Sequence, residues 1–121
     1  MKINTDGAFS TVNGKAAVGV IIRDEPGNPM LTAWRVLFRC KDAEEAEALA
    51  CLQGLRLATR WQEKFFIVES DCAQLMSKLQ GEVEDRSIIT GIVEGIRSKC
   101  RELQGVLLKK IGRKKNAVAH D

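Results

Sequence analysis

The stretch Lys2-Ile3-Asn4-Thr5-Asp6-Gly7 opens the chain with a strand that we expect to end at Asp6. Two further strand patterns follow, Ala16–Arg23 and Met30–Leu37, and the first of these is rich in β-branched residues. Between them, Asp24-Glu25-Pro26-Gly27-Asn28-Pro29 is a turn signal, because Pro fixes φ and Gly accepts positive φ. Short connections favour antiparallel pairing, so this part of the chain predicts a three-stranded meander.

The remainder of the chain alternates helices and strands. We expect Asp42 to cap the first helix, with Glu45 three residues later as in a capping box. The expected elements are a helix Ala43–Trp61, a strand Phe65–Glu69, a helix Asp71–Leu79, a helix Ile88–Cys100, a strand Val106–Ile111 and a helix that begins near Asn116. This order predicts an α/β fold with a mixed five-stranded sheet and helices on both faces.

A chain of 121 residues is expected to form one domain with one core, covering 1–121. Because it starts at a first strand and stops inside the last expected helix, we expect a truncated piece of a longer polypeptide. We also expect a monomer. No apolar run approaches the roughly 20 residues needed to cross a bilayer, and the start is not a signal peptide. The sequence therefore predicts an intracellular protein that does not enter a membrane.

The cysteines and the single histidine exclude some chemistries. No C-x-x-C pair occurs, which argues against a zinc site, and we expect free thiols at Cys40, Cys51, Cys72 and Cys100. His120 is the only histidine and lies next to the chain end, which argues against a Ser-His or Cys-His mechanism. Trp34 and Trp61 could stack on bases, but we interpret both as core residues.

One face of the long helix carries small residues, Cys51, Gly54 and Ala58, with Glu47 at its upper end. Small side chains let a helix approach a sheet closely. This pattern predicts that Glu47 is held near the end of a strand and away from bulk water.

Three acidic residues occur in three different contexts, and each has an ordinary interpretation when taken alone. Asp6-Gly7 is typical of a turn, Glu47 is one more glutamate on a glutamate-rich helix, and Asp71 could cap a helix. Carboxylates at the ends of separate elements can nevertheless converge on one point. Converging carboxylates repel unless cations lie between them, and oxygen ligands of this kind favour Mg²⁺ or Mn²⁺. Two such ions about 4 Å apart are a common apparatus for phosphodiester hydrolysis.

Longer segments around these residues carry a family resemblance: Ile3-Asn4-Thr5-Asp6-Gly7-Ala8, Ala46-Glu47-Ala48-Leu49-Ala50 and Val68-Glu69-Ser70-Asp71. Over essentially its whole length the chain resembles the ribonuclease H-like superfamily, in particular the plant and retroelement branch of reverse-transcriptase-like ribonuclease H domains. The resemblance implies a metal-dependent endonuclease that hydrolyses the RNA strand of RNA–DNA hybrids. It implies that Asp6 bridges two Mg²⁺ or Mn²⁺ ions and that Glu47 and Asp71 complete their coordination.

The chain departs from the family pattern near its end. His120 stands where the family's fourth metal ligand is usually an Asp, four residues after Asn116. A neutral imidazole can bind a metal, so His120 is a candidate ligand, but it could equally bind nothing, and Asp121 could take its place. The loop 110–115 lacks the histidine of bacterial-type enzymes, and Ala43-Glu44 replaces their hybrid-contacting asparagines. The alternative function is therefore a catalytically weak or inactive domain that binds nucleic acid or a protein partner.

The net charge is only +3, but basic residues cluster near the end of the chain. Such a cluster is either a solvated surface run or a phosphate-binding patch. Beside an expected metal site we favour nucleic-acid binding by Lys109, Lys110, Arg113, Lys114 and Lys115.

Overall fold

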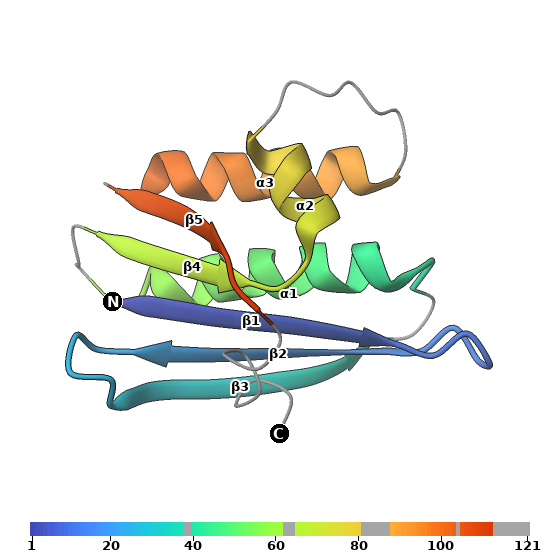
Figure 1. The fold of residues 1–121 in the computed structure, drawn as a ribbon, viewed down its shortest axis with the longest axis horizontal. Helices are drawn as coiled ribbons and strands as arrows, with labels where there is room; N and C mark the ends of the chain where they lie inside the picture. Colours follow the sequence, from blue (N-terminus) through green and yellow to red (C-terminus); the bar gives the residue numbers. More distant parts are fainter. Residues whose placement is uncertain (38–39, 62–64, 81–87, 104, 113–121) are drawn as a thin grey trace.

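The computed structural model describes residues 1–37, 40–61, 65–80, 88–103 and 105–112 (Figure 1). In chain order its elements are β1 (Lys2–Phe9), β2 (Ala16–Arg23), β3 (Pro29–Leu37), α1 (Ala43–Ala58), β4 (Phe66–Ser70), α2 (Ala73–Gln80), α3 (Ile88–Glu102) and β5 (Val106–Lys110). The polar connection 81–87 and the helix expected from Asn116 lie outside the described residues.

The strands form one mixed sheet in the order β3-β2-β1-β4-β5. β1, β2 and β3 pair antiparallel, whereas β4 is parallel to both β1 and β5. The predicted meander and the five-stranded mixed sheet are therefore confirmed. The prediction that β1 ends at Asp6 is wrong, because β1 continues to pair with β2 as far as Phe9, which lies opposite Ala16.

Helix α1 lies directly against the sheet, and glycine on the helix allows this close approach. A Cβ built on Gly54 would lie 2.8 Å from Ile3 Cγ2 and 3.0 Å from Thr5 Cγ2. The small-residue face predicted for this helix is thus its sheet-facing side. Asp42 caps the helix as expected, since its Oδ1 accepts the Glu45 N–H at 2.8 Å. The helix ends at Ala58, three residues earlier than predicted.

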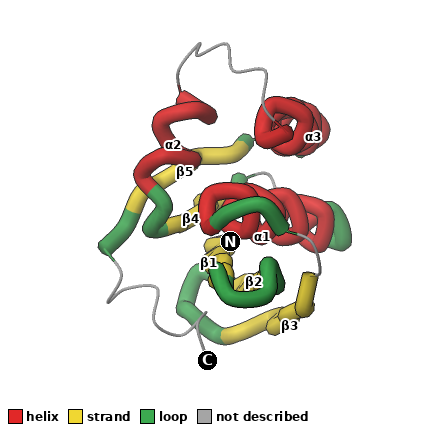
Figure 2. Tube along the Cα trace, turned by 90° about the vertical axis from the view of Figure 1, so that its right-hand side faces the viewer, coloured by secondary structure: helices red, strands yellow, loops and turns green. Residues whose placement is uncertain are grey.

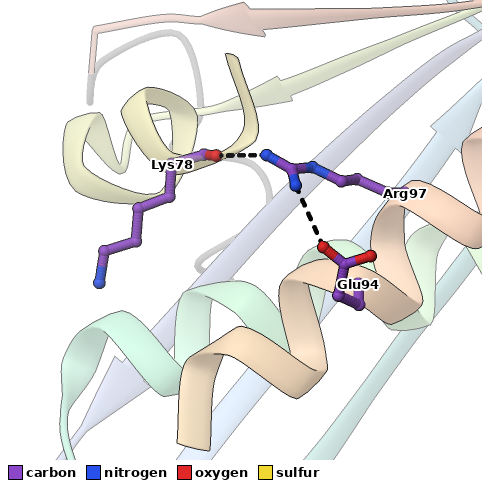
Figure 3. Close-up of polar contacts among 3 residues, drawn as sticks. All are labelled: Lys78, Glu94 and Arg97. Atoms are coloured by element: carbon purple, nitrogen blue, oxygen red, sulfur yellow. Dashed lines mark hydrogen bonds and ion pairs between the residues drawn. The ribbon is translucent and has the colours of Figure 1, made fainter. Parts of the chain in front are cut away.

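The other two helices are tied to α1 and to each other. Figure 2 shows α3 as a second layer on the outer side of α1, and both lie on the same side of the sheet. Because the last expected helix lies outside the described residues, the covering of both faces stays a prediction. Lys78 on α2 forms a partly buried ion pair with Glu44 on α1 at 2.8 Å. Its backbone oxygen accepts a hydrogen bond from Arg97 on α3, and Arg97 also binds Glu94 (Figure 3). These contacts fix the helix that closely follows Asp71.

The core lies between the sheet and α1 and extends to α3. Its largest fully buried side chains include Ile3, Ile22, Leu55, Phe66 and Ile96. All four cysteines are free thiols, as predicted. Trp61 packs on the edge of this core, but the core prediction for Trp34 is wrong: it lies on the edge strand β3 and is 67% exposed. None of the helices in the described ranges has the length and apolar character that a membrane span requires.

A candidate metal centre between β1, α1 and β4

Asp6 and Asp71 lie where two neighbouring parallel strands separate. The pairing of β1 with β4 runs from Lys2 opposite Ile67 to Asn4 opposite Glu69 and goes no further. Asp6 is two residues beyond this last pair on β1, and Asp71 is two residues beyond it on the other chain segment. Both aspartates therefore follow the same rung of the sheet, which explains how residues so far apart in sequence come together.

Glu47 reaches the same place from the first turns of α1. A Cβ on Gly7 would lie 2.5 Å from the backbone carbon of Ala46 and 2.6 Å from the nitrogen of Glu47, so only glycine fits at position 7. The Gly7 backbone N–H donates a hydrogen bond to the Glu47 carboxylate. The close contact between β1 and α1 thus brings Glu47 near Asp6, and the Gly7 N–H orients its carboxylate.

These three side chains form one acidic cluster. A carboxylate oxygen from each of Asp6, Glu47 and Asp71 lies within 4.8 Å of the other two. Asp6 and Glu47 are only 4% and 6% exposed, and Asp71 is partly buried. Within the described ranges, no other group of three or more His, Cys, Asp or Glu side chains converges in this way.

The electrostatics of Glu47 reflect this crowding. Burial raises the pKa of Glu47 from its ordinary value of 4.5 to about 8, opposed by the Gly7 N–H and reinforced by the charges of Asp6 and Asp71. A proton on Glu47 relieves the repulsion in the metal-free protein, and a cation would relieve it more completely.

The cluster fits a divalent cation with oxygen ligands. Glu47 Oε2 is buried and has no hydrogen-bond partner among the described residues, and a cation that replaced the proton of Glu47 would satisfy this oxygen. All the ligand atoms are carboxylate oxygens, the type that Mg²⁺ and Mn²⁺ prefer. The arrangement can therefore hold a metal of this class and present it to an anionic substrate.

The remaining predicted site residues are only partly described. Lys109 and Lys110 are exposed at the end of β5, where they lie opposite Glu69 and Ser70 of β4. The two lysines thus lie on the strand directly next to β4, and Asp71 follows β4 in the chain. Arg113, Lys114, Lys115 and His120 lie outside the described residues.

Two features of this site were missed in the sequence. One is the need for Gly7 as a contact point for α1, since Asp-Gly suggested a turn. The other is a buried hydrogen bond from Asn4 Nδ2 to Glu69 Oε1 at 3.0 Å. The sequence held the same indication of both features. Gly7, Asn4 and Glu69 are a glycine and two polar residues inside segments that otherwise have the pattern of buried strands.

Comparison with known families agrees with this geometry. The family model described as reverse transcriptase-like matches residues 4–121. The chain belongs to the reverse transcriptase-like family of the ribonuclease H-like superfamily. No curated protein matches it in sequence.

Solved structures show the same fold as this reverse transcriptase-like chain. The RNase H1 of the halophilic archaeon Halobacterium salinarum superposes with a TM-score of 0.89 at 18% identity, covering 98% of this chain and 90% of that one. An RNase H1 solved with an RNA/DNA hybrid gives 0.88 at 22% identity, with 98% and 90% covered. A foamy viral protease-reverse transcriptase in complex with an RNA/DNA hybrid gives 0.83 at 11% identity, with 98% and 18% covered. At these identities the likeness establishes the fold.

Proposed function

We propose that this chain is a metal-dependent endonuclease that hydrolyses the RNA strand of RNA–DNA hybrids. The observation that carries the proposal is the convergence within 4.8 Å of Asp6 on β1, Glu47 on α1 and Asp71, which directly follows β4. Membership of a ribonuclease H-like family supports the choice of reaction, and two structural neighbours were solved with RNA/DNA hybrids.

In this proposal Asp6, Glu47 and Asp71 hold two Mg²⁺ or Mn²⁺ ions, with His120 as the fourth ligand. Bound ions of this kind supply an activated water and stabilise the leaving oxygen of an in-line displacement. The water oxygen bonds to phosphorus as the P–O3′ bond breaks, which leaves a 5′-phosphate and a 3′-hydroxyl. Gly7 keeps the Glu47 carboxylate oriented through its N–H, so the ligand geometry exists before substrate arrives.

The basic cluster supplies the substrate contacts in this proposal. Lys109 and Lys110 are exposed beside the segment that carries Asp71, so a phosphate backbone could reach both the lysines and the carboxylates. We assign Arg113, Lys114 and Lys115 to the same role. Contacts of this type recognise helix shape, 2′-hydroxyls and phosphates and not base sequence.

A substrate panel tests the proposal. Matched duplexes of RNA–DNA, RNA–RNA and DNA–DNA, and the single RNA strand, are incubated with the protein in Mg²⁺ or Mn²⁺. We expect the RNA of the hybrid to be cut preferentially, and Asp6→Asn to abolish the cutting. Salt-sensitive binding of the hybrid without cleavage in either ion would replace this proposal with that of an inactive binding domain.

A further inference from the structure

We propose that Asn4 and Glu69 form a positioning pair that sets the spacing between Asp6 and Asp71 and thereby the affinity of the metal centre. This inference rests on the proposed function for its link to catalysis, but its effect on metal affinity can be measured without substrate. The pair consists of a hydrogen bond from Asn4 Nδ2 to Glu69 Oε1 at 3.0 Å. Both residues are buried, each with 8% of its surface exposed.

The pair lies between the two segments that carry Asp6 and Asp71. Asn4 and Glu69 are direct partners in the last registered rung between β1 and β4. Side chains two residues apart on a strand point to the same face of the sheet, so the side chains of Asn4 and Asp6 share one face. Asp71 has the same two-residue offset from Glu69. The hydrogen bond therefore bridges the two segments just before the point at which each delivers one carboxylate to the cluster.

The chemistry of the pair suits this role. A neutral amide that donates to a carboxylate makes a charge-assisted hydrogen bond, which is shorter and stronger than a neutral one. Burial strengthens it further and raises the cost of breaking it. In the parallel pairing of β1 and β4, only three residue pairs are in register, so a side-chain bond at the last of them limits how far the segments can splay.

Glu69 has a second conceivable role, as a further metal ligand or a source of negative charge. The structure favours positioning, because Glu69 Oε1 is committed to Asn4 and Glu69 is not among the three converging residues. The two roles differ in what they require. If Glu69 acts by positioning, residue 69 must accept a hydrogen bond from Asn4. If Glu69 binds the metal or acts through its negative charge, residue 69 must be ionised.

Two nearly isosteric neutral variants separate these requirements. Glu69→Gln removes the charge but keeps an oxygen that can accept from Asn4, whereas Glu69→Met removes both. Mn²⁺ binding to the folded 121-residue protein is measured by isothermal titration calorimetry without nucleic acid. We expect Glu69→Gln to stay within about threefold of the wild-type Kd and Glu69→Met to weaken binding at least about tenfold, as is typical when a residue that orients a metal ligand is changed.

A reversed pair gives a rescue test. In Asn4→Asp/Glu69→Gln the glutamine donates to the aspartate, which restores the hydrogen bond and the original net charge. We expect its Kd for Mn²⁺ to return to within about threefold of the wild type. Val93→Ala, at a core position of α3, is the stability control. We expect it to lower Tm and to leave the Kd unchanged.

Equal weakening in Glu69→Gln and Glu69→Met would show that the charge acts, and wild-type affinity in both would show that the pair does not matter; either result overturns the proposal. If Glu69→Met does not fold, Asn4→Leu/Glu69→Met replaces both partners by apolar groups and must show the same loss of affinity.

In hybrid cleavage, kcat should follow the Kd while KM changes less than about threefold. A wild type that binds Mn²⁺ but cuts nothing would defeat the proposed function and leave the positioning test intact.

Discussion

Gly7 on β1 and Glu47 on α1 are in such close contact that a Cβ on Gly7 would lie 2.6 Å from the backbone nitrogen of Glu47. The same contact includes the hydrogen bond from the Gly7 N–H to the Glu47 carboxylate. One backbone approach therefore serves both the packing of the helix on the sheet and the geometry of the acidic cluster.

Gly7→Ala should damage the protein for this reason. The new methyl group would meet backbone atoms of Ala46 and Glu47, which cannot rotate away as a side chain could. We expect the free energy of unfolding to fall by about 1–3 kcal/mol or more, measured by urea denaturation, and Mn²⁺ binding to weaken.

Gly91→Ala is the matched control for that substitution. Gly91 is exposed on α3, and a Cβ there has no neighbouring atom within 4 Å. Alanine favours helix over glycine, so this variant should gain about 0.5–1 kcal/mol. Equal effects of the two substitutions would contradict the close contact at Gly7.

The raised pKa of Glu47 predicts a dependence of stability on pH in the metal-free protein. Between pH 4.5 and about 8 the folded state keeps a proton on Glu47 that the unfolded state has released. The contribution of this group is therefore full below pH 4.5 and is lost as pH rises to about 8, by an amount on the order of a few kcal/mol. Urea denaturation across this range in a chelator should show the fall in the wild type.

Glu47→Gln should remove that fall, because glutamine does not titrate, whereas Glu102→Gln on the surface of α3 should retain it. A wild-type slope that persists in Glu47→Gln would assign the pH dependence to other groups. Because a cation must displace the proton, Mn²⁺ affinity should rise with pH up to about 8.

Metal binding should stabilise the fold. At a Mn²⁺ concentration of about 100 times Kd, the expected gain is about 2.7 kcal/mol, visible as a higher Tm that a chelator reverses. Asp71→Asn should lose most of this gain. Without metal it should be at least as stable as the wild type, since it removes one of three clustered carboxylates. A full metal-induced shift in Asp71→Asn would place the ion elsewhere.

The two described lysines of the basic cluster should contribute to hybrid binding. Lys109→Gln and Lys110→Gln should each weaken binding and lower the slope of log K against log salt by about one, because each variant neutralises one phosphate fewer. Lys99→Gln, on α3 and paired with Glu102, is the control and should change neither quantity. Fluorescence anisotropy over a salt series, with a chelator present, measures both.

Local sequence patterns predicted much of the fold. The β-branched run Ala16–Arg23 coincides with β2, and Asp42 caps α1 as its sequence context indicated. The predicted end of β1 was wrong because Asp6-Gly7 is typical of a turn, whereas pairing with β2 carries the strand to Phe9. The prediction for Trp34 was wrong because Trp34 lies on the edge strand β3 opposite Gly19 of β2, which has no side chain to pack against it.

The candidate site depended on information that local patterns do not contain. Asp6, Glu47 and Asp71 were singled out through a family resemblance, since each alone had an ordinary interpretation. The approach of Asp6 to Asp71 follows from the register of β1 against β4, two strands about 65 residues apart in sequence. The approach of Glu47 follows from the contact of α1 with Gly7. The Asn4–Glu69 pair was missed for the same reason: neither residue reveals its partner until that register is known.

The most direct test of the central claim is cleavage of an RNA–DNA hybrid with a labelled RNA strand, in Mg²⁺ and separately in Mn²⁺, by the wild type beside Asp71→Asn. We predict that only the RNA strand is cut, that the products carry 5′-phosphate and 3′-hydroxyl ends, and that Asp71→Asn is inactive. No cleavage by a wild type shown to be folded and to bind Mn²⁺, or equal cleavage by Asp71→Asn, would contradict the assignment of this acidic cluster as a nuclease centre.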